Sequence, residues 1–193
     1  YGYGSPHDND INGIGEFNST CTTTKEFTRA QSDMATIFSA SSLDLGDALT
    51  FAHDNLGSGL STNAPASYGT RINQSWRVDE DNEPGNISIS FDLSGTGIST
   101  VRSNDFALLI DNDTNFSDAT VHTLGLSSSG NRINVTTVNL SDGEYFTLAV
   151  SEKTPNIDFV NPTPANATTY GQSSFTINIT SNASNDDHYT FVN

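Results

Sequence analysis

The sequence contains very few sulfur-bearing residues. Its 193 residues include one cysteine, Cys21, and one methionine. A single cysteine excludes an intrachain disulfide, and it excludes a metal cage built from several thiolates. Cys21 lies in the alternating run NSTCTTTKEF, where we expect it to be a small buried side chain.

Positive charge is also scarce. Seven Lys and Arg residues stand against 23 Asp and Glu residues, which gives a formal net charge of −16. So few cations cannot line a groove that follows phosphates, and nucleic acid is therefore excluded as a partner. The same charge disfavours anionic membrane surfaces. Three explanations for the acidity stay open: binding of divalent cations, a salt-rich habitat, and the solubility of an exposed protein.

Long apolar runs are missing as well. No stretch of the sequence is long and apolar enough to enter a bilayer, so we predict no direct membrane insertion. No window carries an apolar stripe at helical spacing. The chain starts at Tyr1 with neither a methionine nor a signal peptide. We therefore expect a processed product or an excerpt of a longer protein.

The sequence does contain a regular series of β-like runs. In NISISFDL, Ile87, Ile89 and Phe91 fall on one side of an extended chain and the polar residues on the other. Trp76 lies in a similar alternating run and is expected in the core. The runs cover residues 33–40, 47–54, 71–80, 86–93, 105–111, 119–126, 132–140 and 144–152. The pattern predicts an all-β fold, an antiparallel β-sandwich of jelly-roll or immunoglobulin-like type, over residues 1–153.

The composition changes in residues 154–193. Pro155, Pro162 and Pro164 interrupt strand pairing, and only the runs SSFTINITSN and HYTFVN follow them. About 40 residues without a disulfide or a metal rarely fold alone. We therefore expect a partial immunoglobulin-like β segment that is covered by the first domain, by missing downstream sequence or by a neighbouring subunit. The last alternative makes this segment a device for polymerisation by strand addition.

Asn-x-Ser/Thr sequons are frequent and predict a secreted, N-glycosylated protein. Several fall inside predicted strands, where a glycan has to point to solvent. We therefore expect an extracellular or cell-surface location, with N-linked glycans on the outward faces. The ten acceptor asparagines are Asn18, Asn73, Asn86, Asn112, Asn115, Asn134, Asn139, Asn166, Asn178 and Asn182.

Two acidic segments are candidates for Ca²⁺ binding. DNDING places Asp8, Asp10 and Asn12 at alternate positions before a glycine, as the first half of a calcium loop does. The twelfth position is Ser19, which cannot chelate as a glutamate does, so a complete EF-hand is rejected. A looser and weaker site, completed by Glu16 or a distant carboxylate, remains one alternative. The other is a polar turn whose side chains cap their own backbone.

The second candidate is DNDTNFSD, with Asp111, Asp113 and Asp118 as ligands. A glycan on Asn115, which lies between them, would interfere with chelation. A third acidic segment, VDEDNEPGN at residues 78–86, is interpreted as a solvated acidic hairpin.

Catalytic motifs are not found. His7, His53, His122 and His188 supply imidazoles, and the triplet HDN occurs at both His7 and His53. No Gly-x-Ser-x-Gly elbow accompanies them, so we predict no Ser/His/Asp triad and no enzyme activity. The paired carboxylates of a glycoside hydrolase are not recognisable from sequence spacing, which leaves a secreted hydrolase as a distant alternative.

Several segments together resemble the β-rich module of large bacterial and archaeal cell-surface proteins. They are HDNDINGIG, GDALTFAHDN, QSWRVDE, ISFDLSG, FALLIDNDTNFSDAT and LSDGEYFTLAV, within residues 3–151. The strand Trp76-Arg77-Val78 and the ending DGEYFTLA are the most specific parts. IDFVNPTPANAT and SSFTINITSN are similar to the opening strands of immunoglobulin-like repeats in such proteins. The resemblance implies an exposed structural or adhesive role and supplies no catalytic residues.

These expectations combine into one functional hypothesis and one alternative. The hypothesis is an extracellular structural subunit of a filament, pilus-like fibre, stalk or surface layer. Such subunits would form a homopolymer, or join neighbouring surface modules, by β-strand pairing. The alternative is a carbohydrate- or partner-binding adhesin module within a larger surface protein.

Overall fold

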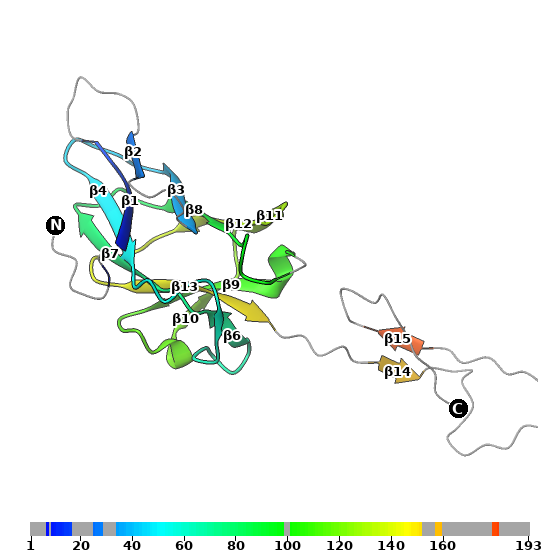
Figure 1. The fold of residues 1–193 in the computed structure, drawn as a ribbon. Helices are drawn as coiled ribbons and strands as arrows, with labels where there is room; N and C mark the ends of the chain where they lie inside the picture. The colour runs from blue at the N-terminus through cyan, green and yellow to red at the C-terminus, as the bar shows by residue number, and fades with distance from the viewer. Residues whose placement is uncertain are drawn as a thin grey trace, which may run out of the picture. The chain divides into compact units, whose positions relative to one another are not determined.

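Strands dominate the described part of this chain, and the all-β prediction is confirmed. The computed structural model describes residues 7, 9–16, 25–28, 34–98, 101–151, 157–159 and 179–181 (Figure 1). The chain divides into two compact units, Tyr1–Glu152 and Lys153–Asn193.

The first unit is built around a nine-stranded antiparallel sheet. Its main path runs in the order β10-β9-β13-β7-β4-β1-β2, and β6 extends it beside β13, with β5 paired to β6. The strands are β1 Asn9–Gly15, β2 Lys25–Thr28, β4 Ala48–His53, β5 Leu60–Ser61, β6 Gly69–Ile72, β7 Trp76–Asp81, β9 Phe106–Asp111, β10 Thr120–His122 and β13 Tyr145–Ser151.

A four-stranded antiparallel sheet covers one face of the first, which gives the predicted sandwich. Its order is β11-β12-β8-β3. The strands are β3 Ala35–Ala40, β8 Ile87–Asp92, β11 Leu126–Ser129 and β12 Arg132–Val138. Two short 3-10 helices, η1 Ser103–Asp105 and η2 Phe116–Asp118, lie in the connections on either side of β9.

Aromatic side chains fill the space between the two sheets. The Trp76 ring stacks on Phe146 with centroids 5.5 Å apart, and the edge of Phe91 from the facing sheet meets Trp76 at the same centroid distance. Such aromatic pairs add to the free energy gained from burial alone. Trp76 is therefore a core residue, as its alternating strand predicts.

The outer face of strand β8 is more buried than its alternating sequence predicts. Ile87, Ile89 and Phe91 point into the core as predicted. Ser88 and Ser90, on the opposite face, are also largely covered. Because β8 lies between β3 and β12, side chains from both neighbours shield its small serines.

The nine-stranded sheet also carries a second, smaller core on its other face. In β9, Leu108 belongs to the main core, whereas Ala107 and Leu109 pack with Phe116 of η2 in a separate cluster. Alternate residues of a strand point to opposite faces. The apolar residues of the run FALLID are therefore buried on both faces of the nine-stranded sheet.

The second unit contributes one short ladder to the described residues. Strand β14, Ile157–Phe159, pairs antiparallel with β15, Ile179–Ser181. These strands belong to the part of the chain in which the sequence predicts a partial β segment.

Candidate functional site

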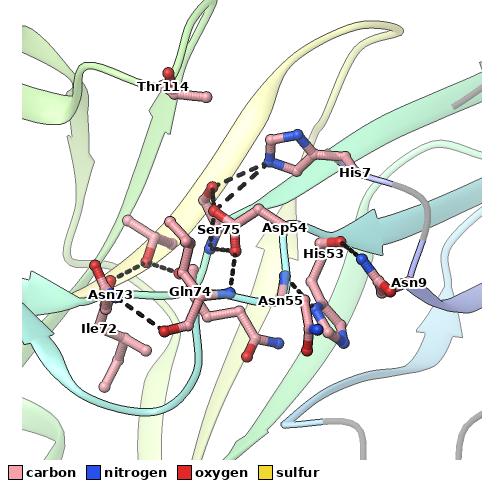
Figure 2. A network of polar contacts seen from close by, with 12 residues as sticks. His7, Asn9, His53, Asp54, Asn55, Ile72, Asn73, Gln74, Ser75 and Thr114 are labelled. Atoms are coloured by element: carbon pink, nitrogen blue, oxygen red, sulfur yellow. Dashed lines mark hydrogen bonds and ion pairs between the residues drawn. The ribbon is translucent and has the colours of Figure 1, made fainter. Parts of the chain in front are cut away.

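A buried polar network gathers where strands β4 and β7 lie side by side (Figure 2). In this ladder His53 is the partner of Trp76, so the next residue after β4, Asp54, meets the residue before β7, Ser75. The Asp54 main-chain N–H donates to the Ser75 carbonyl at 3.2 Å. The Ser75 hydroxyl donates to Asp54 Oδ2 at 2.6 Å, and its main-chain N–H donates to the same carboxylate. The register of β4 and β7 thus places Asp54 beside Ser75.

His7 completes the network from the N-terminal segment. Its Nε2 lies 3.1 Å from Ser75 Oγ and 3.9 Å from Asp54 Oδ2. The imidazole meets the Tyr145 ring edge-on, with centroids 5.0 Å apart. His7, Ser75 and Asp54 are only 2%, 1% and 8% exposed. Buried polar groups need such partners because each unpaired one carries a desolvation penalty.

The direction of the hydrogen bonds decides what this network can do. Because Ser75 Oγ donates to the Asp54 carboxylate, its remaining lone pairs accept from His7 in the tautomer that carries the proton on Nε2. In an acyl-transfer triad the imidazole takes the serine proton, and the carboxylate orients the imidazole. Here the carboxylate holds the serine proton and the hydroxyl is covered. The three residue types of a triad therefore meet, but Ser75 contacts the carboxylate directly, which differs from the arrangement of that triad.

The two HDN triplets of the sequence are brought together at this site. Asn9 is the register partner of His53, and its Nδ2 donates to the His53 carbonyl at 3.3 Å. The Asn55 main-chain N–H donates to His53 Nδ1 at 2.9 Å. The repeated HDN triplet is thus the one feature of the sequence that marks both segments. The separation of the two triplets in the sequence does not show which of their residues pair.

Arg71 supports the network from β6 and was not singled out by sequence reasoning. Its Nε donates to the Asn63 carbonyl, and its Nη1 donates to the carbonyls of Ile72 and Asn73, at 2.7 to 2.8 Å. Its guanidinium lies 4.7 Å from the centroid of the Phe116 ring. Burial lowers the pKa of Arg71, and the negative charge of Asp54 partly opposes that shift.

Thr147 of β13 also contacts the segment that precedes Ser75. Its hydroxyl oxygen lies 3.1 Å from the Ile72 carbonyl and 2.8 Å from the Gln74 carbonyl. The side chains of Arg71 and Thr147 thus contact the carbonyls of residues 72–74 from two strands. The carbonyls of these residues therefore have partners, as buried main-chain groups need.

The first calcium candidate lies on a strand. Residues 9–15 form β1, which has a register shift between Asn9 and Asn12, whereas the sequence predicts a loop or a turn. The Asn12 side chain is fully buried and accepts a hydrogen bond from the main-chain N–H of Ile37 at 3.2 Å. Asn12 therefore links the two sheets. Asp8 and the side chain of Asp10 lie outside the described residues.

The second calcium candidate forms a series of polar turns. Asp111 Oδ1 accepts from the main-chain N–H groups of Asn112 and Asp113, and Asp113 Oδ1 accepts from that of Asn115. Asp118 is exposed at the end of η2. Within the described residues, no three His, Cys, Asp or Glu side chains are grouped to hold a metal. Ca²⁺ binding stays a prediction for both segments.

The sequons differ widely in their surroundings. Of the acceptor asparagines in the described residues, Asn86, Asn112, Asn115 and Asn139 are exposed, and Asn73 and Asn134 are partly buried. The remaining four, Asn18, Asn166, Asn178 and Asn182, lie outside the described residues.

The acidic hairpin at residues 78–86 is not solvated throughout. Glu80 is partly buried, and its main-chain N–H donates to Asp142 Oδ1. Burial raises the pKa of Glu80, and the nearby carboxylates of Glu83, Asp142 and Glu144 raise it further. The folded protein therefore disfavours the ionised form of Glu80.

We expect Glu80→Gln to stabilise the protein at neutral pH. Since the folded pKa lies above the unfolded value of 4.5, the stability that protonated Glu80 contributes is complete below pH 4.5 and lost as pH rises through the folded pKa. The urea midpoint of the variant should exceed that of the wild type at pH 7, and the gap should close towards pH 4. Asp118→Asn, an exposed change on η2, is the control. A gap that is constant with pH would contradict this account.

We expect Ser75→Ala to destabilise the first unit by about 1–3 kcal/mol, because it removes the buried hydroxyl that joins His7 to the Asp54 carboxylate. Fluorescence of the single tryptophan, Trp76, during urea unfolding measures the change. Ser128→Ala, at an exposed position of the edge strand β11, should change the stability by less than about 0.5 kcal/mol. Equal midpoints for the two variants would show that the network contributes nothing.

Comparison with known proteins adds a family and no assigned activity. The described part of the chain contains no helix with the length and apolar character needed to cross a membrane. No curated protein and no solved structure matches the chain. Residues 5–144, which include His7, Asp54 and Ser75, match a family described as a domain of unknown function, DUF8202. Since this match covers most of its length, the chain belongs to the DUF8202 family.

Proposed function

We propose that this protein is an extracellular structural subunit of a cell-surface filament, stalk or surface layer, and that its subunits join by β-strand pairing. The single observation that carries the proposal is the contrast between its two units. The first encloses a main core and a second small core within its own strands. The second unit contributes to the described residues one ladder of two three-residue strands.

We infer that a strand from a second copy extends the short ladder of β14 and β15. An isolated two-stranded hairpin is marginally stable in water, and three or more strands are needed for independent stability. Among the described residues, β14 pairs with β15 and with no other strand. None of the described strands pairs with the second edge of β14 or of β15, and we infer that a strand from another copy pairs there.

Two properties of the first unit support a structural role outside the cell. Four of the six sequon asparagines in the described residues are exposed, and the other two are partly exposed. The triad-type residues are sequestered in a network that holds chain segments together. A net charge of −16 disfavours random contact between copies. Assembly therefore needs a directional contact, which strand pairing provides.

A pair of proline substitutions in β15 tests the proposal. Main-chain N–H groups of successive strand residues point to opposite edges, so Thr180→Pro and Ser181→Pro remove donors from different edges of β15. We expect the wild-type chain to form larger assemblies as its concentration rises, seen by light scattering and electron microscopy. The variant altered at the outer edge should stay monomeric and keep its β14–β15 hairpin.

Two outcomes would contradict the proposal. In one, the wild-type chain stays a clean monomer at every concentration, which favours an adhesin module. In the other, both proline variants assemble as the wild type does. Circular dichroism of each variant checks that the first unit stays folded, because both substitutions lie outside it.

A further inference from the structure

We infer that the fold sorts the sequons of the first unit into open and closed acceptors, and that the open ones gather at one end of the nine-stranded sheet. The open set is Asn112, Asn115 and Asn139, whereas Asn73 is closed. The inference rests on the proposed extracellular location only for its role in the cell. The accessibility of each site is a property of the fold itself.

The chemistry of N-glycosylation sets the criterion. A transferase forms a bond between the anomeric carbon of an oligosaccharide and the asparagine Nδ2. The anomeric carbon leaves the oxygen of a lipid diphosphate donor, and the amide loses one proton. The acceptor motif also requires the hydroxyl of the third residue. An open site therefore exposes both the amide and that hydroxyl residue.

In the Asn73 sequon the amide is engaged in a hydrogen bond and the hydroxyl residue is buried. Asn73 Nδ2 donates to the Leu56 carbonyl at 2.9 Å, and its main-chain N–H donates to the Gly59 carbonyl at 2.7 Å. Its hydroxyl residue is Ser75, which is 1% exposed and bonded to Asp54 and His7. Modification of Asn73 therefore requires the buried network to open.

Two further sequons lie on the four-stranded sheet and are partly shielded. Asn86 is exposed, but its hydroxyl residue Ser88 is covered within β8. Asn134 is itself partly buried in β12. The Thr136 hydroxyl of the Asn134 sequon donates to the Gly125 carbonyl at 3.2 Å. These two sites fall between the open and the closed sets.

The three open sequons present both groups to solvent. Asn112, Asn115 and Asn139 are exposed. Their hydroxyl residues, Thr114, Ser117 and Ser141, are exposed as well.

Strand register places these open sequons at a common end of the sheet. Asp111, the last residue of β9, is the partner of Tyr145, the first residue of β13. The segments that carry the open sequons, residues 112–117 and 139–144, adjoin these two partners. Strand β13 runs from there to Ser151, its last residue (Figure 1). Glycans on the open sites would thus leave the Ser151 end of the sheet uncovered.

The experiment uses the whole unglycosylated chain in its folded state. A purified oligosaccharyltransferase and a lipid-linked oligosaccharide are added, and mass spectrometry measures the occupancy of each sequon. The same reaction on proteolytic peptides of the chain gives the intrinsic reactivity of each site. The ratio of folded to peptide reactivity then isolates the effect of the fold.

We expect ratios near unity at Asn112, Asn115 and Asn139, and a ratio about 10- to 100-fold lower at Asn73, because at least one buried hydrogen bond must open there. Thr114→Ala is a matched control that should abolish reaction at Asn112 alone. The inference is overturned if Asn73 reacts in the folded chain as it does in its peptide, or if the three open sites are as unreactive as Asn73. This reaction needs neither secretion nor assembly. A failure of the glycosylation test can therefore be distinguished from a failure of the strand-pairing proposal.

Discussion

The rest of the first unit depends on the register of one antiparallel pair, β4 with β7. Pairing His53 with Trp76 sends the indole into the space between the sheets and sets Asp54 beside Ser75. A slip of one residue would exchange the two faces of β7. It would expose Trp76 and separate the groups that hold His7. Core packing and the buried network therefore favour the same register, which is the kind of consistency that specifies a single fold.

In the proposed assembly, subunits join through the second unit. In the first unit, Asn12 links β1 to β3 across the sandwich, and Phe116 packs with Ala107 and Leu109 on the other face of the large sheet. The polar groups most suggestive of catalysis are used to join chain segments. In the proposed function, glycans on the exposed sequons and the net charge of −16 would keep copies apart unless a directional contact joins them.

Local patterns predicted most strand regions but not all strand boundaries. The predicted run 71–80 is divided between β6 and β7, the run 119–126 is divided between β10 and β11, and β1 was not among the predicted runs. The long-range polar contacts were predicted poorly. The alternation around Ile87, Ile89 and Phe91 identified a core face correctly, because that signal lies within one strand. The motif DNDING suggested a loop. In the structure, however, Asn12 accepts a hydrogen bond from a main-chain N–H of β3, a strand distant in sequence. Likewise, sequons can be counted from sequence, but the covering of Ser75 depends on residues that only the strand register brings near.

The central claim is that a second copy completes the short sheet of the second unit, and hydrogen exchange tests it most directly. The amides of β14 and β15 should gain protection as the concentration of the whole chain rises, because the added strand binds the folded state. Those of β9 and β13 should be equally protected throughout, since their partners lie within the same unit. Full protection of β14 and β15 at high dilution, unchanged on concentration, would contradict the account.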